Sequence, residues 1–145
     1  MIGQLYKVLR PGRECIYGGR GPWPESGVPF KVEGKLVECS NGLHVLTVEQ
    51  LPMWVTCPCE VWEVSVPEGC EFVAATPNVF VVREATLTRC VGSIEQEDWL
   101  AIRSFEPGPG KLSLEPYEDM VEMLGQVGER ILAYLSGKKG ENGVA

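Results

Sequence analysis

A single histidine and a closely spaced pair of cysteines are the residues that offer the most specific chemistry. His44 is the only imidazole in the chain of 145 residues, and Cys57 and Cys59 flank Pro58. Together with Cys39, these side chains would supply a zinc ion with ligands of the right type. The spacing argues against such a site, because paired zinc ligands are usually separated by about two to four residues. One intervening proline favours a turn before the next strand, so no metal is predicted.

A cysteine–histidine dyad would have to use the same imidazole. Cys39 lies close to His44 in the sequence, and a hairpin through the Asn41-Gly42 turn could bring the two together. Because His44 follows the turn on a strand rather than beside an obvious nucleophile, a structural role is favoured. All six cysteines are predicted to be reduced thiols packed as small hydrophobic residues, with one disulfide bridge as the alternative.

Carboxylates are abundant but give no specific catalytic signal. Of the 20 acidic residues, 18 are glutamate, and many pairs among them are possible. Glu60 and Glu63 flank Trp62 on a predicted strand, where they would face opposite sides. Glu14 and Glu63 lie in apolar surroundings and are the least surface-like. Nothing in the sequence selects one of them, so no catalytic residue and no cofactor is predicted.

An acidic helix with a tryptophan is the best candidate for a binding surface. A helix is predicted over 93–105, where Ser93-Ile94-Glu95-Gln96 forms a capping-box pattern and acidic residues occupy the first turn. Its apolar stripe is typical of a core, and the alternative is a partner-binding face with an aromatic anchor and a charged rim. On that alternative the predicted contact residues are Glu95, Glu97, Asp98, Trp99, Ile102 and Phe105.

Charge and composition narrow the classes of partner. A formal net charge of −7 disfavours nucleic acid, whose phosphates would be repelled, and suits a basic protein surface. Abundant glutamate with few asparagine and glutamine residues is typical of heat-adapted proteins. The sequence contains no apolar run long enough to span a membrane and no signal peptide, so we expect a cytoplasmic protein. Because no specific catalytic set is found, a binding protein without a small-molecule substrate is expected.

The elements predicted to hold these residues form one α+β domain over 1–137. Turn residues separate short apolar runs without intervening helices, which favours a twisted, mainly antiparallel sheet. A second short strand over 14–17 and a short helix after residue 47, opened by a Thr47-to-Gln50 capping box, are also expected. The main strands are predicted over 5–10, 29–32, 35–39, 43–46, 60–66, 70–75, 79–83 and 86–91.

The last third of the chain is predicted to be helical. The helix over 93–105 is followed by a second, amphipathic helix over 114–136 that packs across the sheet. Gly125 and Gly128 each weaken this helix by about 1 kcal/mol relative to alanine, and they would let another backbone approach closely. Residues 138–145 are polar and glycine-rich and are predicted to form a flexible tail. The apolar stripe of the second helix consists of Tyr117, Met120, Val121, Leu124, Val127, Ile131 and Leu135.

Two resemblances follow from short motifs. Leu5–Val8, Cys39–Val45 with its Gly-Leu-His-Val element, and Val61–Val64 with its Trp-Glu-Val element are similar to a loosely defined family of small phage and environmental proteins. This resemblance covers about residues 5–90 and implies a phage origin. The strand order also resembles ADP-ribosyltransferase-like folds, which would imply an NAD-using enzyme with His44 or Tyr6 near Glu63.

Size, acidity and heat-adapted composition are similar to those of small early proteins of Thermus bacteriophages that inhibit host RNA polymerase. This resemblance implies a non-enzymatic inhibitor in the host bacterial cytoplasm. It would bind the flap of the β subunit and the C-terminal region of the primary σ factor, so that recognition of the −35 promoter element fails. No binding residue is carried over by position, and the ADP-ribosyltransferase-like enzyme is the alternative.

Overall fold

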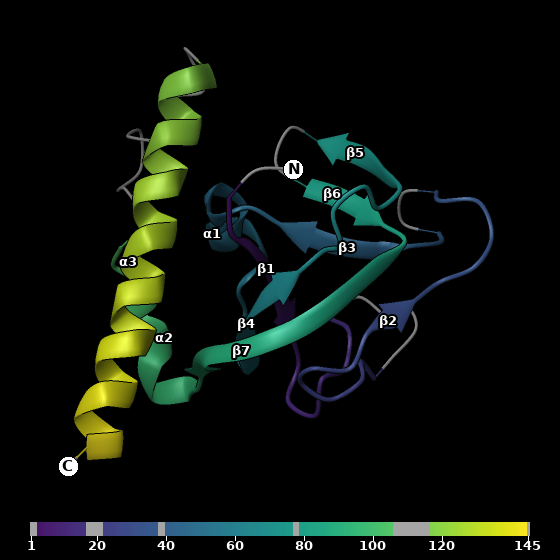
Figure 1. Ribbon diagram of the computed structural model, residues 1–145. Coiled ribbons are helices and arrows are strands. Elements are labelled where there is room, and N and C mark those ends of the chain that lie inside the picture. Colours follow the sequence, from purple (N-terminus) through teal and green to yellow (C-terminus); the bar gives the residue numbers. More distant parts are fainter. Residues whose placement is uncertain (1–2, 17–21, 38–39, 77–78, 106–116, 145) are drawn as a thin grey trace.

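A computed structural model describes residues 3–16, 22–37, 40–76, 79–105 and 117–144. Its strands form a seven-stranded sheet in the order β2-β7-β4-β1-β3-β6-β5 (Figure 1). The paired strands of the described residues are all antiparallel, and helices follow the sheet, so the predicted α+β fold is confirmed. The strands are β1 (Leu5–Leu9), β2 (Phe30–Lys31), β3 (Leu43–Leu46), β4 (Cys59–Ser65), β5 (Phe72–Thr76), β6 (Val79–Val82) and β7 (Glu84–Ile94).

The inner strand β1 shows that the sheet is buried on both faces. β1 lies between β3 and β4. Its side chains alternate between two core clusters, with Tyr6 and Val8 in one and Leu5 and Leu9 in the other. All four side chains are at most 8% exposed. Since successive side chains of a strand point to opposite faces, each face of the sheet must have its own cover.

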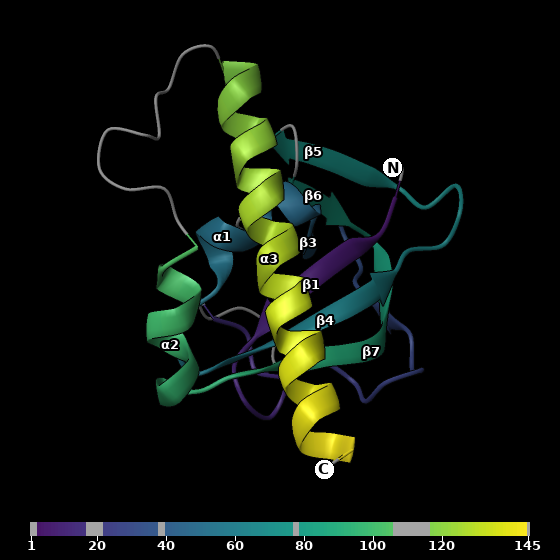
Figure 2. The same ribbon diagram turned by 90° about the vertical axis from the view of Figure 1, so that its left-hand side faces the viewer.

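Helices cover one side of the sheet, which we call the helix-covered face. The 3-10 turn η1 (Val48–Gln50) leads into α1 (Leu51–Trp54), and α2 (Gln96–Arg103) and α3 (Tyr117–Val144) follow β7. Figure 2 shows α3 running across the sheet in front of β1 and β4. The amphipathic repeat predicted this packing correctly, because its buried members are Leu124, Val127, Ile131 and Leu135.

A glycine on α3 allows the closest approach between this helix and the rest of the fold. A Cβ atom at Gly128 would lie 2.2 Å from the carbonyl oxygen of Val48 in η1, a distance that real side chains do not tolerate. At Gly125 the nearest atom to such a Cβ would be Cγ of Glu49 at 3.3 Å, which belongs to a flexible side chain. The expected close backbone approach therefore occurs at Gly128, where helix propensity is given up for packing.

A segment with little regular structure covers the opposite side of the sheet, which we call the loop-covered face. Trp23, Val32 and Leu36 are buried there against the second core cluster. The ring of Trp23 packs edge-on against Phe30, with the ring centroids 5.3 Å apart. Within residues 22–37, only β2 forms a strand of the sheet. Of the hairpin predicted over 29–39, β2 and one bridge between Val37 and Asn41 are present in the described residues.

Two predicted helix starts differ from the structure in detail. The helix predicted from Ser93 begins at Gln96, because β7 continues to Ile94, which pairs with Cys59 on β4. The predicted helix after residue 47 is present as η1 and α1, but the hydroxyl of Thr47 makes no capping bond. That hydroxyl is buried and has no hydrogen-bond partner among the described residues.

The two C-terminal helices also end at different residues than predicted. α2 ends at Arg103, before the predicted end at Phe105. α3 continues to Val144, beyond the predicted end near residue 136. The side chains of Tyr117 and Met120, at the start of the predicted stripe, lie outside the described residues. The flexibility of the tail over 138–145 stays a prediction.

Candidate functional site

The helix α2 carries most of the predicted contact residues, and its start is fixed by Asp98. The backbone N–H of Glu95 donates to Oδ2 of Asp98 at 2.9 Å. The hydroxyl of Tyr134 on α3 donates to Oδ1 of the same carboxylate, also at 2.9 Å. Asp98 is only 1% exposed. Its carboxylate therefore joins the first turn of α2 to α3, and it satisfies a backbone donor that the helix itself cannot pair.

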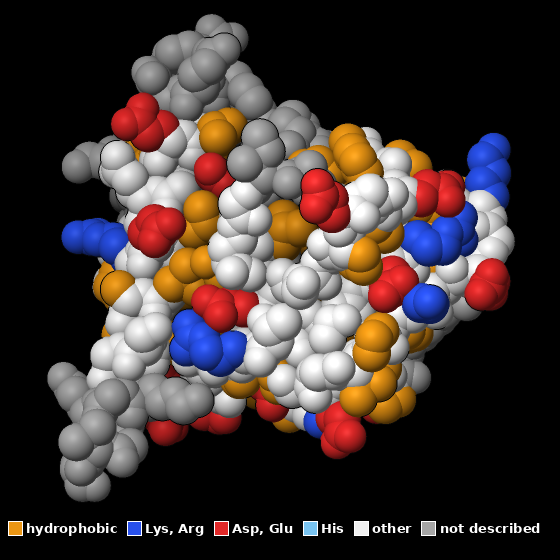
Figure 3. Space-filling view, in the orientation of Figure 1, with side chains coloured by type: hydrophobic (Ala, Val, Ile, Leu, Met, Phe, Trp, Pro, Cys, Tyr) orange, Lys and Arg blue, Asp and Glu red, His pale blue; other side chains and the backbone are white. Residues whose placement is uncertain are grey.

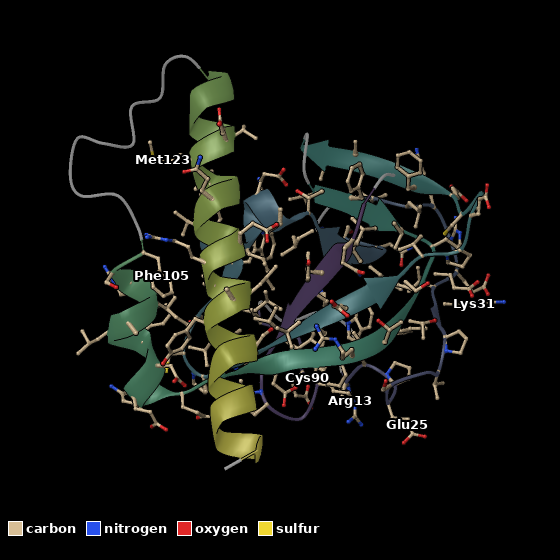
Figure 4. All side chains as sticks on the ribbon, turned by 60° about the vertical axis from the view of Figure 1, so that its left-hand side comes forward. Arg13, Glu25, Lys31, Cys90, Phe105 and Met123 are labelled. Atoms are coloured by element: carbon tan, nitrogen blue, oxygen red, sulfur yellow. The ribbon has the colours of Figure 1, made fainter. Side chains whose placement is uncertain are left out.

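The inner side of α2 is held by apolar and aromatic contacts. Ile102 is buried in the core of the helix-covered face. Phe105, just after the helix, packs edge-on against Tyr134 with the ring centroids 5.9 Å apart. The guanidinium of Arg130 lies 5.8 Å from the centroid of the Phe105 ring. Figure 4 shows Phe105 between the end of α2 and α3, so this side of α2 faces the fold.

The outer side of α2 presents acidic and apolar side chains to solvent. Glu95 and Glu97 are exposed, and Leu100 is 82% exposed. Trp99 is half-buried, and the guanidinium of Arg103 lies 5.9 Å from the centroid of its ring. The structure thus places four of the six predicted residues on α2 and the other two at its ends, with Glu95 just before the helix and Phe105 just after it, and it divides the six between two sides. Glu95, Glu97 and part of Trp99 face outward, whereas Asp98, Ile102 and most of Phe105 face inward.

Leu100 is the outward-facing residue that the sequence analysis missed. A residue two positions beyond Asp98 is rotated by about 200° around the helix axis. Once Asp98 and Ile102 are taken as the inner side, Leu100 must therefore face outward. The helical spacing contains this signal, but the stripe of Trp99, Ile102 and Phe105 alone does not reveal it.

The cysteines and the histidine form no metal-binding group in the described part of the chain. No cluster of three or more histidine, cysteine, aspartate or glutamate side chains is found there. Cys59 is buried, and burial raises the pKa of its thiol to about 12, so the reactive thiolate is strongly disfavoured. Cys57, Cys59 and Cys70 form no disulfide. Cys39, part of both the zinc and the dyad hypotheses, lies outside the described residues.

The residues named for an NAD-using enzyme lie on neighbouring strands. Tyr6 on β1 is the cross-strand partner of Glu63 on β4. Burial, and then the charge of Glu63, raises the pKa of the Tyr6 hydroxyl. The guanidinium of Arg89 binds both carboxylate oxygens of Glu63, at 3.0 and 3.1 Å. This bidentate pair gives Glu63 a structural role, and His44 is separated from it by β1.

A half-buried lysine on the loop-covered face has no carboxylate partner among its described contacts. The ammonium group of Lys7 donates to the backbone carbonyl of His44 at 2.9 Å and lies 5.3 Å from the centroid of the Trp23 ring. Burial lowers the pKa of Lys7 to about 8. The residue as a whole is half-buried, and the burial of its ammonium group makes the charged form cost free energy.

Comparisons with known proteins do not assign this chain to a family. No protein-family model, curated protein or solved structure matches it. In the described residues, the helices are too short or too polar to cross a membrane. The functional interpretation therefore depends on the surface of the chain itself and on the resemblances of its sequence.

Proposed function

We propose that this chain is a phage-encoded binding protein that inhibits the RNA polymerase of its bacterial host. In this proposal the outer side of α2 docks on the polymerase, and the β-subunit flap and the C-terminal region of the σ factor are the contact sites. The observation that carries the proposal is Leu100, an apolar side chain that is 82% exposed on a helix held firmly by the fold. An apolar anchor on a rigid element, with a charged rim, is the usual arrangement of an interface hot spot.

The rigidity of α2 supports docking because little conformational freedom would be lost on binding. Asp98 ties the start of the helix to Tyr134, and Ile102 and Phe105 hold its inner side. The outer side then presents Leu100 together with the exposed part of Trp99. The residues that face inward support the interface, and those that face outward make the contact.

Charge supports a basic partner surface. The chain carries a net charge of −7, and Glu95 and Glu97 lie beside Leu100 on the exposed side of α2. Figure 3 shows acidic side chains spread over the visible side of the molecule, including α3. Such a surface speeds association with a basic protein, and salt weakens this attraction beyond a screening length of about 8 Å. The choice of RNA polymerase comes from the resemblance to Thermus phage inhibitors.

The alternative is an ADP-ribosyltransferase-like enzyme that uses NAD. The pairing of Tyr6 with Glu63 across two strands is the observation that favours it. The same glutamate is bound at both oxygens by Arg89, and Tyr6 is largely buried, so neither group is presented for catalysis. Docking is therefore the preferred function.

The test is promoter-dependent transcription by Thermus RNA polymerase holoenzyme in the presence of the purified chain. We expect inhibition that reaches completion near one chain per polymerase, needs no NAD, and weakens as the salt concentration rises. Transcription that is unchanged at several-fold molar excess would contradict the proposal. Consumption of NAD by the purified chain, measured in parallel, would instead support the enzyme.

A further inference from the structure

A groove of about 770 Å³ opens beside the loop that joins β4 to β5. Residues 3–5 and the end of β4 line the groove, together with Phe72 at the start of β5. Its volume is within the range of about 300–1,000 Å³ that small-molecule sites occupy. Figures 1 and 2 place β5 and α2 at different ends of the molecule, so this groove is separate from the proposed docking surface.

Three of the polar side chains that line the groove, those of Gln4, Cys70 and Thr88, already donate hydrogen bonds to backbone carbonyls. Nε2 of Gln4 donates to two backbone carbonyls, at 2.9 and 3.2 Å. Oγ1 of Thr88 donates to a backbone carbonyl at 3.1 Å. The thiol of Cys70 is within reach of two backbone carbonyls, at 3.4 and 3.8 Å. The capacity left on the amide and the hydroxyl is that of acceptors, so these groups suit a ligand that donates hydrogen bonds.

The charge of the groove also favours a ligand that donates hydrogen bonds. Among the described residues that line it, Glu68 is the only one with a formal charge. Glu68 lies in a tight turn in which the N–H of Cys70 donates to the carbonyl of Pro67 at 3.0 Å. Gly69 completes the turn with a φ of +79°, which few other residues adopt. The exposed carboxylate is therefore carried by an ordered turn at the rim of the groove.

Apolar side chains provide the remaining surface. Leu5, a buried member of the core of the loop-covered face, and Val66, which packs against that core, line the groove. The ring of Phe72 is 45% exposed, and it is held edge-on against Phe80 with the ring centroids 5.8 Å apart. A positioned aromatic ring of this kind can stack with a flat apolar group or attract a cation.

We propose that this groove binds small organic cations, in which an ammonium or guanidinium group is attached to an apolar, preferably aromatic, body. The cation donates hydrogen bonds to Glu68 and to the acceptor groups of the wall, and the body lies on Phe72 and Leu5. An anion would be repelled by the carboxylate of Glu68. A neutral ligand would lose the charge-assisted hydrogen bond, which is the strongest polar contact that the groove offers.

The test uses 2-naphthylmethylammonium as the probe, and its neutral and anionic counterparts are 2-naphthylmethanol and 2-naphthoate. Amide resonances in two-dimensional NMR spectra of the full chain report binding. We expect the cation to shift the resonances of Gln4, Gly69 and Phe72 in a saturable way, with an affinity at least about tenfold above that of either counterpart.

Substitutions locate the contact. Glu68→Gln is expected to weaken binding of the cation by about tenfold, and Phe72→Ala by a few-fold. Glu97→Gln removes the same charge from α2 and should leave the affinity unchanged. Equal binding of the anion, shifts confined to other parts of the chain, or equal effects of Glu68→Gln and Glu97→Gln would overturn the proposal.

Discussion

The two faces of the sheet are covered in different ways, although each has its own buried core cluster. On the helix-covered face, α3 places Val127, Ile131 and Leu135 over the strands at regular helical intervals. On the loop-covered face, a mostly irregular segment contributes Trp23 and other separate apolar residues, and this core also encloses the charged end of Lys7. One face is thus covered by regularly spaced side chains of a helix, and the other by separate side chains of an irregular segment.

Because of this difference, we expect substitutions on the two faces to change the stability of the fold in different ways. On the helix-covered face, Asp98, Ile102 and Phe105 join α2 to the rest of the fold, and the proposed docking surface is the outer side of this helix. The irregular cover includes a lysine whose charge is unfavourable inside, and a groove opens beside its core. We therefore expect substitutions on the helix-covered face to cost stability, and at least one substitution on the loop-covered face to increase it.

The largest expected effect is on the helix-covered face. Ile131→Ala removes a side chain that is 1% exposed and leaves a cavity under α3. The expected loss is about 2–5 kcal/mol in the free energy of unfolding, measured by chemical denaturation. Leu100→Ala is the control, because its side chain is mostly in solvent and its loss should cost less than about 0.5 kcal/mol. Equal losses for the two variants would show that α3 does not carry the core.

On the loop-covered face, substitution of Lys7 should raise the free energy of unfolding rather than lower it. Because the pKa of Lys7 is lowered to about 8, its buried charge destabilises the fold fully below pH 8. This cost fades as the pH rises toward the ordinary pKa of about 10.4, where the unfolded chain also loses the proton. Lys7→Met is therefore expected to raise the free energy of unfolding by up to about 3 kcal/mol at pH 7.

The pH dependence distinguishes this effect from improved packing. The advantage of Lys7→Met over the wild type should shrink between pH 8 and about pH 10.4 when denaturation is repeated across that range. Lys31→Met, at an exposed lysine of β2, is the matched control and should show no such change. A Lys7→Met advantage that is constant with pH, or a loss of stability at pH 7, would contradict a buried charge.

A smaller effect distinguishes two glycines of α3. Gly128→Ala places a methyl group 2.2 Å from the carbonyl oxygen of Val48, so α3 or η1 must shift. We expect a net loss of about 1–3 kcal/mol despite the gain in helix propensity. Gly125→Ala meets only the side chain of Glu49 at 3.3 Å and should be neutral or stabilising by up to about 1 kcal/mol. Thermal melting of both variants tests this prediction. A stabilising Gly128→Ala would show that α3 and η1 are less tightly packed than in this structure.

Most of the helix-covered face could be predicted because its signals are local and periodic. The spacing of Leu124, Val127, Ile131 and Leu135 identifies both the helix and its buried side. The start of α2 could not be predicted in the same way. A capping pattern begins at Ser93, but pairing of Ile94 with Cys59 keeps this segment in β7. Here a contact with a distant strand outweighs the local preference.

The loop-covered face was harder to predict because its contacts join distant and irregular segments. Lys7 lies two residues from both Leu5 and Leu9 on β1, so its side chain points to the same face of the sheet as theirs. This spacing was the sequence signal for its burial. Its cover by Trp23 depends on the path of an irregular segment, which no repeat encodes. The groove likewise exists because the beginning of the chain lies beside the loop that carries Glu68. Such proximity is a property of the tertiary fold.

The most direct measurement of the central claim compares Leu100→Ala with Met53→Ala as inhibitors of Thermus RNA polymerase. Both residues are exposed and apolar, at 82% and 64%, but Leu100 lies on α2 and Met53 on α1. If the outer side of α2 is the docking surface, Leu100→Ala should raise the half-inhibitory concentration by about tenfold or more without changing the melting temperature. Met53→Ala should inhibit like the wild type. Full inhibition by a folded Leu100→Ala variant would contradict the claim.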